Sequence, residues 1–182
     1  MIDKWLTMHK VKQLQTNIFN IDLCVNDSIW NKELKSLESK IPTIVDHIMN
    51  KLDIAKNNSN IELSIVLTND EETQKLNLEY RDKNKPTNVL SFPAQNFDID
   101  DIASFSNKSI LSLGDIVISY ETLKKECIEQ NISFNDHFVH LLTHGFLHLL
   151  GFDHITKKEA DQMENLEIAI LAQFGIQSPY AS

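Results

Sequence analysis

The sequence predicts an α+β fold in a single domain, a small mixed sheet of about four strands packed with helices around one buried, histidine-bearing helix. Strand-like and helix-like segments are interleaved early in the chain, whereas helix-like segments gather at its end. Residues 138–150 are apolar almost all round, which is typical of a helix buried on every side. The chain has 182 residues, of which 42% are apolar and 24% charged, so it can fill one core and is too short for two ordinary domains.

The N-terminal part is expected to supply one strand and a helical region. Residues 1–15 are polar with scattered apolar side chains, and we expect them to be a loose N-terminal extension of a domain that spans residues 1–182. Residues 17–25 alternate apolar and polar side chains, which predicts a half-buried strand. A helix is predicted over residues 29–52, and Pro42 is expected to interrupt it.

The rest of the chain alternates predicted strands and helices. Residues 94–112 are long, polar and poorly patterned, which is typical of a loop that is mobile or functional. Strands are predicted at residues 61–67, 87–92 and 113–119, and helices at residues 68–80, 120–130, 135–150 and 156–174.

Composition excludes several classes of protein. No apolar run approaches the roughly 20 residues of a membrane helix, and the N-terminus has no signal-peptide pattern, so we expect a soluble cytoplasmic protein. Cys24 and Cys127 lie outside any C-x-x-C pattern and are expected to be reduced, buried thiols. The formal net charge of −9 argues against a broad nucleic-acid footprint, so any phosphate site must be local.

The basic residues are almost all lysine. Of 17 lysines and arginines only Arg81 is an arginine, and Lys83 and Lys85 follow it closely. A position that keeps arginine in such a chain indicates a need for the planar, bidentate fork that lysine lacks. These three residues form a small cationic patch that is suited to binding phosphate.

Three histidines have metal-ligand spacing. His144 and His148 are four residues apart, so on a helix their rings project from one face. Gly151 follows the last apolar residues and can end the helix in a left-handed conformation, which brings His154 back as a third ligand. Three imidazoles around Zn²⁺ leave a fourth position for water, which is typical of a catalytic site.

Other residues are candidates for supporting the ligands. His140 lies on the face of His144 one turn earlier, and it is expected either to contact a ligand histidine without binding the ion itself or to pack in the core. Metal-bound histidines commonly donate their other N–H to a carboxylate or carbonyl. Asp115, Asp153 and Asp136 compete for that role, and the sequence does not choose among them.

The histidine segment has the spacing and internal glycine of the metzincin zinc proteases. Position 145 is glycine, however, where a zinc protease carries the glutamate that acts as general base. Peptide hydrolysis would therefore lack its usual proton acceptor.

The same segment resembles the YbeY family of bacterial rRNA maturation factors, which are metal-dependent single-strand endoribonucleases. The family motif H-G-x-L-H-L-x-G-[YF]-D-H is matched throughout residues 144–154, with Phe152 in place of the more usual tyrosine. Two further blocks, residues 76–92 and residues 113–119, resemble the family in the right order. The likeness runs from about residue 61 to residue 180.

The resemblance implies a zinc-like ion held by His144, His148 and His154, and a part for Arg81 in RNA cleavage. It also implies a role in maturing the 3′ end of 16S rRNA and in ribosome quality control, with single-stranded rRNA and the ribosome or its small subunit as partners. Two alternatives stay open from the sequence. One is a metallohydrolase of another class with metzincin-like ligand spacing, and the other is a non-enzymatic ribosome-assembly factor with a structural metal.

Overall fold

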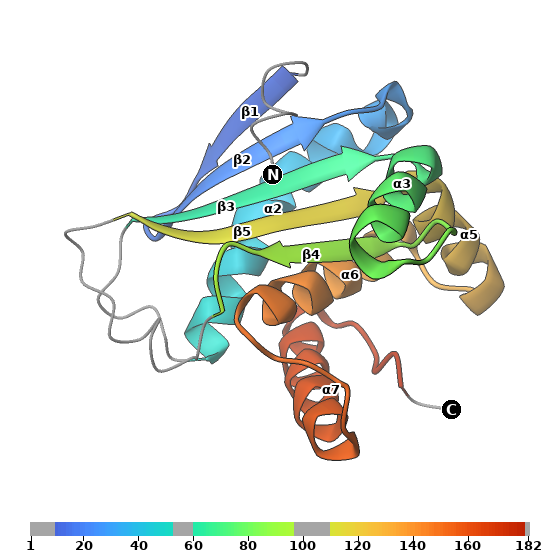
Figure 1. Cartoon of the computed structure of the whole chain (residues 1–182). Helices are drawn as coiled ribbons and strands as arrows, with labels where there is room; N and C mark the ends of the chain where they lie inside the picture. The colour runs from blue at the N-terminus through green and yellow to red at the C-terminus, as the bar shows by residue number, and fades with distance from the viewer. Residues whose placement is uncertain (1–9, 53–59, 97–109, 181–182) are drawn as a thin grey trace.

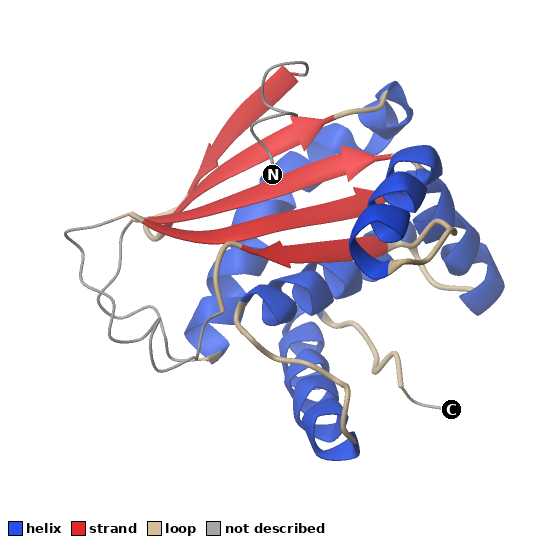
Figure 2. Cartoon of the chain, in the orientation of Figure 1, coloured by secondary structure: helices blue, strands red, loops and turns tan. Residues whose placement is uncertain are grey.

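The computed structural model describes residues 10–52, 60–96 and 110–180. Within these ranges a mixed sheet carries helices on both faces (Figures 1 and 2). In chain order the elements are β1 (Lys10–Gln15), β2 (Phe19–Val25), the short 3-10 helix η1 (Ser28–Trp30), α2 (Asn31–Lys51), β3 (Ile61–Thr68), α3 (Asp70–Arg81), β4 (Val89–Pro93), β5 (Leu111–Ser119), α5 (Tyr120–Gln130), α6 (Phe134–Leu149), α7 (Lys157–Leu171) and η2 (Ala172–Phe174).

The sheet has the strand order β1-β2-β3-β5-β4. Its three central strands are parallel, and the edge strands β1 and β4 each run antiparallel to their neighbour. The register places Leu23, Ile65, Ile116 and Ser91 in one row across β2, β3, β5 and β4. The three aliphatic members of this row belong to the main core, so the row faces the helices that pack there.

The two faces of the sheet are covered unequally. The main core lies between the sheet and α2 and α6, and α7 packs against α6 on the side away from the sheet (Figure 1). A smaller cluster of Cys24, Val66, Leu76, Leu90 and Val117 lies under α3 on the opposite face. Helix α6 is therefore enclosed by the sheet, α2, α5 and α7. The predicted α+β class with a buried histidine-bearing helix is confirmed.

The sheet has five strands among the described residues, where about four were predicted, because Lys10–Gln15 form the edge strand β1. The expectation of a loose extension is wrong for these residues, and residues 1–9 lie outside the described part. Val11 packs against the small cluster and Leu14 against the main core. With one apolar residue on each face, β1 has no alternating pattern to reveal it, and polar side chains are typical of an edge strand.

Pro42 does not interrupt the helix as predicted, since α2 continues through it from residue 31 to residue 51. A proline inside a helix costs about 3 kcal/mol because a backbone hydrogen bond is lost. The buried residues of this helix lie on both sides of the proline and require one continuous helix to reach the core, and their burial outweighs that cost. They are Leu37, Ile41, Ile44, Val45, Ile48 and Met49.

The other elements agree with the prediction within a few residues. The helix over 120–130 is found with the same bounds, whereas β5 begins at Leu111, two residues earlier than predicted. The predicted loop over 94–112 falls mostly on residues 97–109, which lie outside the described part. No helix in the described ranges is both long and apolar enough to cross a membrane.

Candidate metal centre

Helix α6 is defined at both ends by local hydrogen bonds. At its N-terminus the Ser133 hydroxyl accepts a hydrogen bond from the Asp136 backbone N–H at 3.0 Å. At its C-terminus the Gly151 N–H donates to the His148 carbonyl and the Phe152 N–H donates to the Leu147 carbonyl, both at 3.1 Å. This is the pattern of a Schellman motif, and Gly151 adopts the left-handed conformation it requires, with φ of 89°. The predicted glycine reversal is confirmed.

The reversal brings the three predicted ligand histidines together. One ring nitrogen from each of His144, His148 and His154 lies within 4.8 Å of the other two. The Nε2 atoms of His144 and His148 are 3.1 Å apart. Two nitrogens bound to one tetrahedral ion at roughly 2.0–2.1 Å are about 3.4 Å apart, so this pair is already close to the spacing that an ion requires. The donor set and its spacing therefore fit a transition-metal ion.

The protonation states also suit metal binding. Burial, with smaller contributions from His144 and His154, lowers the pKa of His148 to about 4, so its ring is neutral at pH 7. His144 Nδ1 lies 2.8 Å from Glu167 Oε1, and because a carboxylate only accepts, Nδ1 carries the proton and Nε2 carries none.

Glu167 is the residue that the sequence reasoning missed. It lies in α7 with 0% of its surface exposed. Burial alone would raise the pKa of its carboxyl group, but hydrogen bonds from His140, His144 and Tyr180 outweigh burial and lower that pKa to about 2. The signal was present in the sequence, since Glu167 shares the buried stripe of Met163, Ile170 and Leu171 at helical spacing. An acid on an apolar stripe indicates a buried partner.

The other predicted supporting residues are placed differently. His140 is near the cluster, with Nε2 at 3.3 Å from Glu167 Oε2. Asp153 accepts a hydrogen bond from the His154 backbone N–H at 2.8 Å. Asp115 lies in β5 opposite Phe92, and strand alternation puts it on the face of Val117, away from α6. The structure therefore brings His140 and Asp153 to the centre and places Asp115 on the opposite face of the sheet.

Arg81 approaches the histidines from another element. It is the last residue of α3, which ends in a left-handed Asp82 with φ of 55°. A cavity of about 350 Å³ is lined by both Arg81 and His148, together with Phe152, Asp153 and residues of β4 and of the segment after it. Lys83 and Lys85 are exposed on the loop that follows α3, and neither is among the described residues that line this cavity.

Gly145 lies where α6 touches the sheet. A Cβ at this position would be 3.0 Å from both Ile116 Cγ2 and Ser91 Oγ, and 3.3 Å from Val89 Cγ2. The Ser91 hydroxyl donates to the Gly145 carbonyl at 3.0 Å. A side chain at 145 would therefore point toward β4 and β5. This accounts for glycine at the position where a zinc protease carries its glutamate.

We expect Gly145→Ala to lower the free energy of unfolding by about 0–2 kcal/mol, because overpacking costs about 1–3 kcal/mol and the gain in helix propensity returns about 1 kcal/mol. Gly145→Glu should cost more, roughly 4 kcal/mol or above, since it also buries a carboxylate. Urea unfolding measures the first variant, and soluble yield with circular dichroism the second. Lys158→Ala is the control, because Lys158 is exposed within α7 and its replacement should change stability little. A Gly145→Glu protein as stable as wild type would contradict this account.

Comparison with known proteins gives consistent matches. A model of the endoribonuclease YbeY family matches residues 25–175. An endoribonuclease YbeY from Agrobacterium fabrum is 50% identical over 121 residues, which cover 66% of this chain and 68% of that protein. One from Colwellia psychrerythraea is 50% identical over 123 residues, which cover 68% and 74%. A solution structure from Thermotoga maritima aligns over 89% of this chain and 99% of its own, with 20% identity and a TM-score of 0.49.

The fold and the histidine cluster define a candidate three-histidine metalloprotein in which the helix that carries two of the histidines is buried under a mixed sheet. Within that class, the chain belongs to the endoribonuclease YbeY family, since the family model spans most of its length and two members are 50% identical to it. The resemblance seen in the sequence is confirmed.

Proposed function

We propose that the protein is a metal-dependent, single-strand-specific endoribonuclease that acts in maturation of the 16S rRNA 3′ end and in ribosome quality control. Its membership of the endoribonuclease YbeY family supports the reaction class. The observation that carries the proposal is the cavity lined by both Arg81 and His148, because a guanidinium group suited to phosphate then lies beside histidines that could hold a metal ion.

The proposed ligands are His144, His148 and His154, and the proposed ion is Zn²⁺, one per chain. Three neutral imidazoles suit zinc, although they also accept other divalent transition metals. When bound, the ion supplies Lewis-acid polarisation at the phosphate and lowers the pKa of bound water. His148 is both a proposed ligand and a cavity-lining residue, so the ion would face the same space as the substrate.

The chain's own residues have separate tasks in this proposal. Arg81 holds the phosphate through the parallel N–H donors of its guanidinium group and stabilises the charge that grows on phosphate oxygens during cleavage. Lys83 and Lys85 add positive charge on the neighbouring loop, where they attract the RNA backbone. Asp153, which lines the cavity, fixes the start of the turn that carries His154.

The alternatives from the sequence have less support. A protease-like hydrolase needs a general base at position 145, where a side chain would instead meet β4 and β5. An assembly factor with a purely structural metal has no need of an arginine and a histidine that line one cavity. The endoribonuclease is therefore the function that we propose. Its proposed partners are single-stranded rRNA and the small ribosomal subunit. Its proposed location is the cytoplasm, and residues 1–182 are proposed to form one functional domain.

The test is RNA cleavage by the purified protein, with and without a chelator. We expect one ion per chain by elemental analysis, and cleavage of a single-stranded RNA that carries the 3′ end of precursor 16S rRNA. The same sequence in a duplex should stay intact. Chelation should abolish cleavage and Zn²⁺ should restore it. Full activity in the chelated protein, or equal cleavage of the duplex, would refute the proposal.

A further inference from the structure

Glu167 connects three side chains around the metal centre. Its Oε1 atom is 2.8 Å from His144 Nδ1, and its Oε2 atom is 3.3 Å from His140 Nε2. The Tyr180 hydroxyl donates a hydrogen bond to the same Oε2. A fully buried carboxylate is stable only when its oxygens are satisfied, and here α6 and the C-terminal segment supply the donors.

The carboxylate determines how His144 is protonated. Since Glu167 can only accept, it selects the His144 tautomer with the proton on Nδ1. The His144 Nε2 atom, which lies 3.1 Å from His148 Nε2, then carries no proton, so its lone pair accepts a hydrogen bond from His148 in the metal-free protein and is available to an ion that replaces that proton. In the other tautomer, the proton on Nε2 would occupy the position of the metal ion. The lone pair on Nδ1 would then face the lone pairs of the Glu167 carboxylate, which is unfavourable because both groups are acceptors.

Tyr180 lies beyond η2, in the last described segment of the chain, which follows α7. Its ring packs edge-on against the His140 ring, with centroids 6.1 Å apart. Burial, followed by the hydrogen bond to Glu167, raises the pKa of the Tyr180 hydroxyl, so it stays protonated and remains a donor. The C-terminal segment thereby fixes the oxygen of Glu167 that His144 does not use.

We propose that Glu167 and Tyr180 are positioning residues of the metal centre: Glu167 holds His144 in its ligand tautomer, and Tyr180 holds Glu167. The inference rests on the proposed function only in taking His144 as a ligand of the ion. It assigns a role in metal binding to α7 and to the C-terminal segment, which contribute no ligand.

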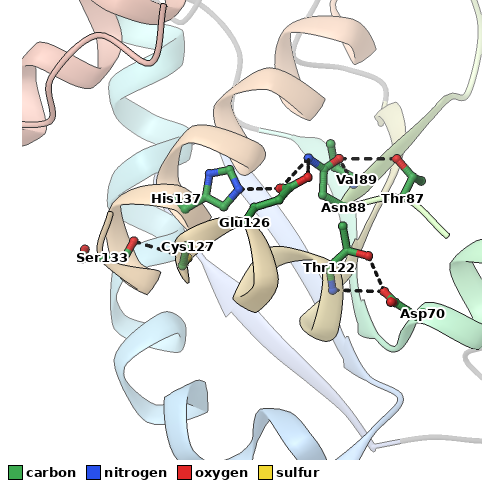
Figure 3. Close-up of polar contacts among 9 residues, drawn as sticks. All are labelled: Asp70, Thr87, Asn88, Val89, Thr122, Glu126, Cys127, Ser133 and His137. Atoms are coloured by element: carbon green, nitrogen blue, oxygen red, sulfur yellow. Dashed lines mark hydrogen bonds and ion pairs between the residues drawn. The ribbon is translucent and has the colours of Figure 1, made fainter. Parts of the chain in front are cut away.

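A second histidine–glutamate pair on α6 provides a matched control. Glu126 of α5 has its Oε2 atom 2.6 Å from His137 Nε2, and it also accepts hydrogen bonds from the Asn88 side chain at 2.9 and 3.1 Å (Figure 3). His137 is 3% exposed, and it precedes His144 by two helical turns. Each pair joins a buried or partly buried glutamate to a histidine of α6, but only the Glu167 pair includes a predicted ligand.

The variants are Glu167→Gln, Tyr180→Phe and the control Glu126→Gln, all close in shape to the wild type. Two quantities are measured: the dissociation constant for Zn²⁺ in a competition assay with a chelating dye, and the tautomer of His144 in metal-free protein by nitrogen-15 NMR of the imidazole ring.

We expect Glu167→Gln to weaken Zn²⁺ binding about 10- to 100-fold and to leave a mixture of tautomers. Tyr180→Phe should weaken binding about 2- to 13-fold, the range of one net hydrogen bond. Glu126→Gln should change the dissociation constant less than about 2-fold, because its contacts do not reach a ligand.

The tautomer measurement needs neither metal nor RNA, so it separates this inference from the proposed function. A protein that cleaves no RNA, but whose His144 loses its Nδ1 proton selectively in Glu167→Gln, would keep the inference and remove the function. An unchanged tautomer and unchanged Zn²⁺ affinity in Glu167→Gln would overturn the inference, even if RNA is cleaved. Equal losses of affinity in Glu167→Gln and Glu126→Gln would also overturn it, since they would indicate a general effect on α6.

Discussion

Replacing His148 by alanine is expected to lower metal affinity and RNA cleavage together, each by more than about 100-fold. Loss of a residue that only supports a ligand typically costs 10- to 100-fold in affinity, and loss of one of three ligands should cost more. His148 and Arg81 line the same cavity, so the substitution should alter both the proposed ion site and the adjacent space for the RNA substrate. Elemental analysis and single-turnover cleavage of one labelled RNA measure the two effects on the same preparation.

His140→Ala is the matched control, because His140 projects from the same face of α6 one turn earlier. Its Nε2 atom points to Glu167, so the ion should remain bound, with an affinity lowered by about 10-fold or less through the weaker hold on that carboxylate. Full metal occupancy in His148→Ala at low metal concentration would remove His148 from the ligand set. If His140→Ala loses the ion while His154→Ala keeps it, the ligands would instead be His140, His144 and His148, and the site would lie one helical turn nearer the N-terminus.

The histidine cluster could be predicted from the sequence because its geometry is local. His144 and His148 share one helix, and Gly151 fixes the turn to His154 with two backbone hydrogen bonds. The arrangement is therefore determined within one eleven-residue segment, residues 144–154. No contact with a distant part of the chain is needed to bring the three rings together, so spacing and one glycine were sufficient.

Glu167 could not be assigned in the same way, because it lies 23 positions from His144 and reaches it only when α7 packs on α6. The sequence offers three aspartates as candidate partners of a ligand histidine. Two of them are close in sequence to the histidines, and the third, Asp115, follows a glycine. Asp115 shows why such reasoning fails: a single step along β5 moves a side chain to the other face of the sheet. The sequence identifies an acid on an apolar stripe, but tertiary packing determines its partner.

The fold was predicted best where burial leaves a regular pattern. Central strands and the buried α6 have one, whereas β1 has one apolar residue toward each core and does not. The prediction at Pro42 was wrong for the opposite reason. Proline locally favours a break in a helix, but the burial of residues on both sides of Pro42 outweighed that preference. The nearness of Arg81 to the histidines was suggested by the family resemblance alone, because Arg81 at the end of α3 and His148 of α6 come to line one cavity only in the folded chain.

The second large effect is expected at Arg81, where lysine should not substitute for arginine. Arg81→Lys should reduce the rate of RNA cleavage about 10- to 100-fold, and Arg81→Ala about 100- to 1,000-fold, the range for loss of one group that stabilises a charged transition state. An ammonium group supplies charge but not two parallel N–H donors at fixed spacing. Single-turnover cleavage at saturating protein measures the rate separately from binding.

Both Arg81 variants should fold and bind metal like the wild type. Arg81 is exposed at the end of α3, and surface substitutions of this kind usually change stability by less than about 0.5 kcal/mol. Its neighbour Asp82 holds the left-handed end of the helix through backbone hydrogen bonds to Asn77 and Leu78, which the substitution leaves in place. Metal content and unfolding in urea check both expectations, so a loss of cleavage can be assigned to the guanidinium group.

Lys83→Ala and Lys85→Ala separate a specific contact from general attraction. Both lysines are exposed on the loop after Arg81 and do not line the cavity with His148, so they should contribute only through charge. Each should weaken RNA binding several-fold at low salt and very little at high salt, because exposed charges are screened. The defect of Arg81→Lys should persist at high salt and appear in the cleavage rate. If Arg81→Lys instead cleaves like the wild type at every salt concentration, Arg81 acts as one positive charge among three and the bidentate contact is excluded.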